Sequence, residues 1–278
     1  MRPASVFFTL FVFAAIGAVA YHLLAARPAR RDENLLARSF REPSGIVFHP
    51  RSKSLFVVGD EGLVGEIALD GSVRRTQSFP GADFEGVAVD PATGLLYALI
   101  EGENAILELD RKDLAIRRRF EIDRRWGGRL LVPAGAEGLE SLAFVPDRGH
   151  REGGRFYIAH RGPATEEAEP QPGRSFLMTL ELPLKSSTDE KATGVIVAAR
   201  GCPVAGLTAL AWTGRPDVLA GVSDEDDLYV EMDLAGKVLR RSHLPGRHQE
   251  GLAFDEGGFM YIAQDSGGVL KLRVPEGE

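Results

Sequence analysis

The stretch Phe84-Glu85-Gly86-Val87-Ala88-Val89 decides how this chain folds, because related stretches return four more times. The other copies are residues 43–48 (PSGIVF), 139–144 (LESLAF), 207–212 (LTALAW) and 249–254 (QEGLAF). Each copy is followed by a turn and then by a β-rich run. A phrase that recurs in this way indicates a repeat architecture, in which every copy forms the same supersecondary unit.

The second copy shows how one unit is built. Residues 86–89 predict a short strand, and residues 90–94 (DPATG) are strong turn formers. Further strands are expected at 95–100, 105–109 and 116–122, separated by polar turns. One unit therefore predicts four consecutive strands.

The remaining units fit this template. The expected strands are residues 45–48, 54–59, 65–69 and 73–79 in the first unit, 141–145, 155–160, 176–182 and 194–199 in the third, 209–212, 218–222, 228–233 and 238–243 in the fourth, and 251–254, 259–264 and 269–274 in the fifth. The fifth unit lacks a fourth strand, which the run at 35–40 can supply.

This pattern predicts an all-β fold, a β-propeller of five four-stranded blades, because radially arranged sheets leave only short, protected edges. The propeller domain is expected over residues 32–278 and is closed by the N-terminal strand 35–40. A sixth blade stays open if the insertion between the third and fourth units hides extra strands. A β-sandwich is the main alternative, but it does not predict a fixed internal phrase.

Composition excludes several classes of protein. The net charge of −7 argues against nucleic acid as a partner, since nothing systematic would neutralise phosphates. The single cysteine, Cys202, excludes an intrachain disulfide and a zinc site built mainly from cysteine.

The first 31 residues differ from the rest of the chain. Residues 6–26 are almost continuously apolar, about the length that crosses a bilayer. A cleaved signal peptide is the competing interpretation, because Ala18-Val19-Ala20 resembles a cleavage site. A buried helix of a soluble domain is a third. We expect a retained single-pass helix in the inner (plasma) membrane with the propeller on the periplasmic or extracytoplasmic side, although the arginines that follow the segment favour the opposite orientation.

The repeat also predicts a site. The first strand of each blade lines the central channel of a propeller, so residues at one register form a ring, here Ser44, Glu85, Glu140, Thr208 and Glu250. Like charges this close raise one another's pKa unless a cation neutralises them. Carboxylates and hydroxyls suit Ca²⁺ better than Mg²⁺, and no His or Cys shares the register to favour zinc. The competing interpretation is structural: a Glu before Gly can cap a turn or bind backbone amides.

Two further groups of charged residues stand out. The ends of the second strands carry a second tier of residues that either rims the site or is simply solvated, namely Asp60, Glu61, Glu101, His160, Asp224, Glu225 and Asp265. An arginine run is expected to form a solvated, charge-protected edge strand, namely Arg117, Arg118, Arg119, Arg124 and Arg125.

The phrases that begin at Glu85 and Glu250, together with 43–46 (PSGI) and 258–262 (GFMYI), resemble the repeated motifs of the SdiA-regulated family of bacterial propeller proteins. They are more distantly similar to phytase-like and gluconolactonase-like propellers. The resemblance covers residues 35–274. It implies a calcium-associated propeller at the cell envelope, without an established reaction, and places the cation on Glu85, Glu140 and Glu250. The chain departs from the pattern where Ser44 and Thr208 replace a carboxylate, and where serine and alanine replace the following glycine in the third and fourth units.

Three functions follow as hypotheses. The first is a membrane-anchored, envelope-exposed propeller with a Ca²⁺-type site on the channel axis, which binds a small ligand or an envelope protein. The second is a metal-dependent hydrolase of phosphoester, lactone or ester bonds, in which a ring carboxylate acts as base. The third is an interaction scaffold without a metal. A phosphatase should carry basic residues near the cation, and the ring register has none; the sequence assigns no catalytic residue.

Overall fold

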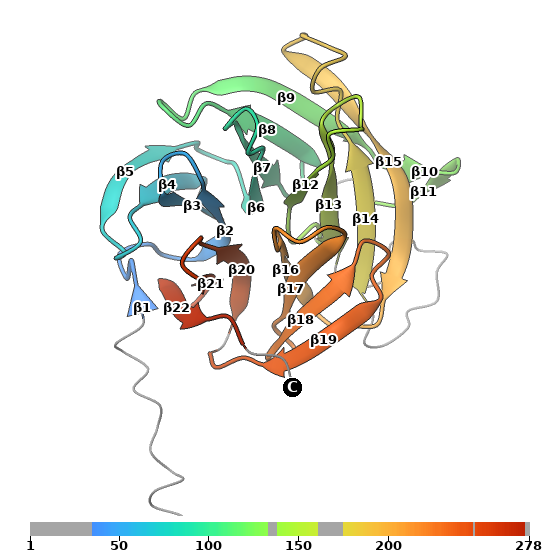
Figure 1. The fold of residues 1–278 in the computed structure, drawn as a ribbon. Helices are drawn as coiled ribbons and strands as arrows, with labels where there is room; N and C mark the ends of the chain where they lie inside the picture. Colours follow the sequence, from blue (N-terminus) through green and yellow to red (C-terminus); the bar gives the residue numbers. More distant parts are fainter. Residues whose placement is uncertain (1–34, 133–137, 161–174, 247, 276–278) are drawn as a thin grey trace, which may run out of the picture. The chain divides into compact units, whose positions relative to one another are not determined.

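The computed structural model describes residues 35–132, 138–160, 175–246 and 248–275, all within one unit that begins at Leu35. These residues are all-β and form three four-stranded sheets, one eight-stranded sheet made of two four-stranded blades, and a small two-stranded hairpin; the blades lie around a common centre (Figure 1). The first blade holds β2 (Pro43–His49), β3 (Ser54–Gly59), β4 (Leu63–Ile67) and β5 (Val73–Ser78). The second holds β6 (Phe84–Val89), β7 (Leu96–Ile100), β8 (Ala105–Leu109) and β9 (Ile116–Asp123).

The other blades repeat this order. The third holds β12 (Ala143–Pro146), β13 (Gly154–His160), β14 (Ser175–Glu181) and β15 (Lys191–Cys202), and the fourth holds β16 (Leu207–Trp212), β17 (Val218–Ser223), β18 (Leu228–Asp233) and β19 (Val238–His243). The fifth holds β20 (Gln249–Phe254), β21 (Phe259–Gln264), β22 (Val269–Arg273) and β1 (Leu35–Leu36). A small hairpin, β10 (Arg125–Trp126) with β11 (Arg129–Leu130), follows the second blade. The fold is therefore a β-propeller with five blades in the described residues.

The ring closes through pairing between the two ends of the unit. β1 runs antiparallel to β22, with Leu35 opposite Leu270 and Leu36 opposite Val269. The chain then turns through residues 37–40 rather than continuing as a strand. The buried ring of Phe40 packs in the core between the fifth and first blades. The two-residue strand and Phe40 therefore add to the apolar contact between the first and fifth blades.

Five apolar clusters hold the blades together, and each lies between two neighbouring blades. For example, Phe56 and Val58 of the first blade pack with Phe84 and Ile100 of the second. Alternate residues of a strand face opposite sides of its sheet, so every blade contributes one face to each of two clusters. The described residues of the unit that starts at Leu35 therefore contain a core between every pair of neighbouring blades.

Glycine recurs in the repeat because the inner strands approach each other closely. A Cβ added at Gly86 would lie 2.6 Å from the backbone nitrogen of Leu142 in the next blade. A Cβ at Gly45 would lie 2.9 Å from the Cα of Gly86. Real Cβ atoms do not approach backbone this closely, so the glycine after the ring residue is a packing requirement at these positions.

The second and third blades are joined along their outer strands. β9 and β15 pair in parallel, with Lys191 opposite Arg119 and Val195 opposite Asp123. The solvated edge expected for the arginine run is therefore wrong at its centre. The Arg118 side chain is 13% exposed and pairs with Glu108 at 2.5 Å, and it also donates to the backbone oxygens of Ser187 and Leu184. An edge strand that gains a neighbour buries side chains which its sequence alone assigns to solvent.

Buried carboxylates form a repeated polar layer on the third strands. Glu108 accepts hydrogen bonds from the Tyr97 hydroxyl and from the Arg118 guanidinium. Glu231 likewise accepts from Tyr229 at 2.9 Å and pairs with Arg240 at 2.6 Å. A buried carboxylate needs such partners, because an unpaired buried charge is strongly destabilising. This layer accounts for charged residues in the blades that lie away from the channel.

The expected membrane helix at residues 6–26 lies outside the described residues. Within the part of the chain that the structure describes, no helix has the length and hydrophobicity of a membrane span.

Candidate cation site at one mouth of the channel

The ring residues share a local distortion of the backbone. In four blades the pairing of the first two strands skips one residue on the inner strand, and the skipped residues are Ser44, Glu85, Thr208 and Glu250. Each is thus the extra residue of a β-bulge, which bends a strand and redirects a side chain. In the third blade β12 starts later, and Glu140 follows an isolated bridge between Leu139 and His160. The register deduced from the repeat is therefore a structural register of the blades.

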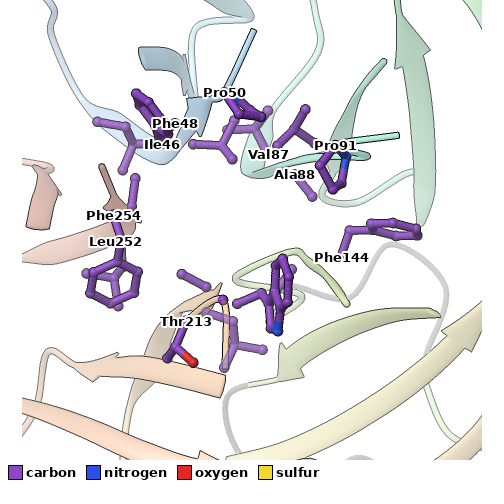
Figure 2. A pocket seen from close by; sticks show the side chains of 18 of the residues that line it. Ile46, Phe48, Pro50, Val87, Ala88, Pro91, Phe144, Thr213, Leu252 and Phe254 are labelled. Atoms are coloured by element: carbon purple, nitrogen blue, oxygen red, sulfur yellow. The ribbon is translucent and has the colours of Figure 1, made fainter. Parts of the chain in front are cut away.

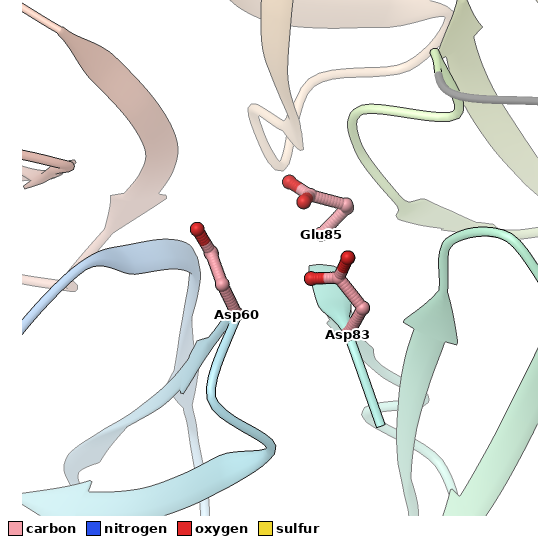
Figure 3. A group of neighbouring side chains, drawn as sticks. All are labelled: Asp60, Asp83 and Glu85. Atoms are coloured by element: carbon pink, nitrogen blue, oxygen red, sulfur yellow. The ribbon is translucent and has the colours of Figure 1, made fainter. Parts of the chain in front are cut away.

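Three carboxylates meet at the mouth where the inner strands begin. Oxygens of Asp60, Asp83 and Glu85 all lie within 4.8 Å of one another, and Figure 3 shows the three side chains facing a common space. Asp60 follows β3, Asp83 immediately precedes β6, and Glu85 is the bulged residue of β6. The hydroxyl of Ser44 donates a hydrogen bond to Asp60 Oδ1, which links the first blade's ring residue to the cluster.

Electrostatics in this cluster are unfavourable for three full charges. Burial raises the pKa of Glu85 from its usual 4.5 to about 9, with further increases from the charges of Glu140, Asp60, Glu101 and Asp83, in that order. Glu85 therefore holds a proton at neutral pH when no cation is bound. Asp60 and Asp83 are exposed, so water or an ion can reach the cluster.

The other ring residues occupy different environments. Glu140 is buried and close enough to Glu85 to raise its pKa more than any other charge does. Glu250 is half-buried and lines the same constriction of the channel as Glu85. Thr208 is fully buried, and its hydroxyl donates to the backbone oxygen of Gln249 at 2.5 Å. Ser44 is thus linked to the cluster through its hydrogen bond to Asp60, and Glu140 acts on Glu85 through its charge. The Thr208 hydroxyl instead bonds the backbone of the next blade.

Two members of the second tier, Asp60 and Glu101, act on Glu85. Glu101 also accepts a hydrogen bond from the backbone N–H of Gly138, 2.5 Å away. Asp224 instead accepts from the backbone N–H of Gln249 at 3.2 Å, a link between the fourth and fifth blades. Asp60 and Glu101 therefore add charge near Glu85, whereas Asp224 connects two blades.

Sequence reasoning missed Asp83. Asp83 lies in the loop before β6, outside the repeat register, so only its closeness in sequence to Glu85 indicated it. The acidic mouth contains carboxylates and a hydroxyl, which are hard oxygen donors of the kind that Ca²⁺ binds.

Beyond the mouth the channel narrows sharply. The constriction has a volume of about 10 Å³ and is lined by residues of all five blades, including Glu85 and Glu250. That space is about enough for one water molecule. The acidic mouth is therefore separated from the opposite mouth by a tight neck.

Comparison with known proteins finds a shared fold in one solved structure and no related sequence. No protein-family model and no curated protein sequence matches the chain. Among solved structures it is similar to a glutaminyl cyclase from Myxococcus xanthus, with a TM-score of 0.59 and 15% identity over 86% of this chain and 92% of that one. It also matches a β-propeller domain from Myceliophteria thermophila, with a TM-score of 0.46 and 10% identity over 83% of this chain and 95% of that one. A hydrazine synthase from Kuenenia stuttgartiensis matches with a TM-score of 0.46 and 11% identity over 89% of this chain and 98% of that one.

Proposed function

We propose that this protein is an envelope propeller of the SdiA-regulated type that binds a divalent cation, Ca²⁺ before Mg²⁺, at the acidic mouth of its channel and uses it to hold a ligand or partner. The observation that carries the proposal is the convergence of Asp60, Asp83 and Glu85 within 4.8 Å. Such a cluster without a cation retains a proton on Glu85, whose pKa is about 9. A bound divalent cation would replace that proton and offset two of the three negative charges of the ionised carboxylates.

The cation's ligands under this proposal are Asp60, Asp83 and Glu85, with the charges of Glu140 and Glu101 nearby. Glu250 lies close to this site, because it lines the same constriction as Glu85. The apolar segment 6–26 would anchor the propeller in the inner membrane, on the periplasmic or extracytoplasmic side. That placement fits a Ca²⁺ site, because extracellular modules bind this ion with Kd values of about 10⁻⁴–10⁻³ M.

Calorimetric titration of the 35–278 domain with Ca²⁺ at about pH 7 tests the proposal. Because cation binding displaces protons from its ligands, the observed heat should depend on the ionisation enthalpy of the buffer, with about one proton released per cation. The Glu85→Gln variant should release none and bind at least tenfold more weakly. Glu61→Gln, which removes an exposed carboxylate next to Asp60, is the matched control. Binding that is absent, or that is unchanged in Glu85→Gln, would refute the proposal.

A second candidate is an enzyme that uses Glu85 as general acid or base. The elevated pKa of Glu85 favours it, because proton-transfer groups work best when the pKa lies near the operating pH. The structural neighbour from Myxococcus xanthus is a glutaminyl cyclase, so glutaminyl cyclisation should be assayed beside ester, lactone and phosphoester hydrolysis. Turnover that is lost in Glu85→Gln and does not need Ca²⁺ would favour this candidate over the first.

A further inference from the structure

The mouth of the channel opposite the carboxylates opens into an apolar cavity of about 330 Å³. Its floor consists of the fourth residue of each repeat, and these side chains also line the narrow neck: Ile46, Val87, Leu142, Leu210 and Leu252. The fifth residue of the repeat is alanine in four blades, which leaves space above the floor. Figure 2 shows side chains from different blades surrounding this space.

The polar side chains of the lining already have partners within the protein. Trp212 Nε1 donates to the backbone oxygen of Arg215, and the Thr213 hydroxyl donates to that of Val218. The Asp255 carboxylate accepts bonds from Tyr261 and from two backbone N–H groups, and Glu256 pairs with Lys53. The side chains of the cavity therefore offer an occupant apolar contact rather than a charge partner.

We infer that this cavity binds a small, uncharged, apolar aromatic molecule. Ligand pockets typically measure about 300–1,000 Å³ and are lined by apolar and aromatic side chains. The volume of about 330 Å³ is about twice the 150 Å³ of a cavity that holds benzene. Five inner strands surround the space and branched side chains close its base, so a compact molecule fits it better than an extended chain does. Trp212 supplies an aromatic wall against which a ring can stack.

Two matched fluorescent probes test this inference on the 35–278 domain, which carries its own core. N-phenyl-1-naphthylamine is neutral, and 8-anilino-1-naphthalenesulfonate adds one sulfonate to nearly the same skeleton. A Trp126→Phe background leaves Trp212 as the single tryptophan. The neutral probe should bind with 1:1 stoichiometry and quench Trp212 by energy transfer, and the sulfonate should bind at least tenfold more weakly.

Variants that fill the cavity should remove binding. Ala211 is half-buried in the lining, so Ala211→Leu should weaken the neutral probe at least tenfold. Val89→Phe is a second filling variant, since the other four repeats carry an aromatic residue at that position. Ala235→Leu, on an exposed turn outside the lining, should bind as the parent does.

The inference is overturned if the neutral probe does not bind, if both probes bind equally, or if both filling variants bind like the parent. Glu85→Gln should leave probe binding unchanged, because the neck separates the two mouths. Failure of the cation proposal and failure of this inference are therefore distinguishable.

Discussion

Replacement of Glu85 by glutamine should remove a steep pH dependence from the stability of the propeller. The pKa of Glu85 is raised from 4.5 to about 9 in the folded protein, first by burial and then by the neighbouring carboxylates. The folded protein therefore holds a proton that the unfolded chain loses. This stabilising contribution is complete below about pH 4.5 and is lost as the pH rises to about 9.

The magnitude follows from the size of the shift. Each pH unit between the two pKa values changes the free energy of unfolding by about 1.4 kcal/mol. Between about pH 5 and pH 7 the free energy of unfolding of the wild-type domain should fall by about 2.7 kcal/mol relative to that of Glu85→Gln, whose amide does not titrate. For a domain of this size that loss corresponds to about 5–11 °C in melting temperature.

Thermal and urea unfolding in EGTA across this pH range measure the effect. The informative quantity is the difference in stability between wild type and Glu85→Gln, because other groups titrate in both proteins. One example is Glu66: burial raises its pKa, but hydrogen bonds from Ser54 and Arg75 lower it, and the net pKa is below the usual value. Glu61→Gln should follow wild type at every pH. A wild-type minus Glu85→Gln difference that stays flat from about pH 5 to 8 would show that Glu85 is not buried beside the other carboxylates as described.

Three further predictions concern the scaffold. Glu108→Ala leaves the nearly buried Arg118 without its carboxylate partner and should lower the free energy of unfolding in urea by about 3–5 kcal/mol. Loss of the exposed Lys53–Glu256 pair should lower it by under about 1 kcal/mol, and equal losses would contradict the burial assigned to Arg118. Gly86→Ala should cost about 1–3 kcal/mol through its clash with the next blade, while Gly201→Ala, with nothing within 4 Å, should be nearly neutral. Burial raises the pKa of Cys202 to about 11, so the native thiol should resist alkylation at about pH 8 and react once urea unfolds the chain.

Much of this architecture follows from the repeat. The phrase around Glu85 predicts the inner strand of each blade, and the turns after it predict the next three strands. The outer pairing of β9 with β15 does not follow, because a parallel contact between blades depends on the length of β15 and its position in space. Arg118 was consequently assigned to solvent although it is buried.

The site shows the same limit more sharply. The register of the repeat identified Glu85 and also Glu140, whose charge acts on Glu85. It nevertheless assigned the same role to all five ring positions. Thr208 shows why equivalence of register is not equivalence of role: its hydroxyl is taken by the backbone of Gln249, whereas the Ser44 hydroxyl bonds the carboxylate of Asp60. Asp83 joins the cluster from a loop that the repeat does not constrain. A five-fold scaffold thus carries an asymmetric site, because the loops between blades supply the residues that break its symmetry.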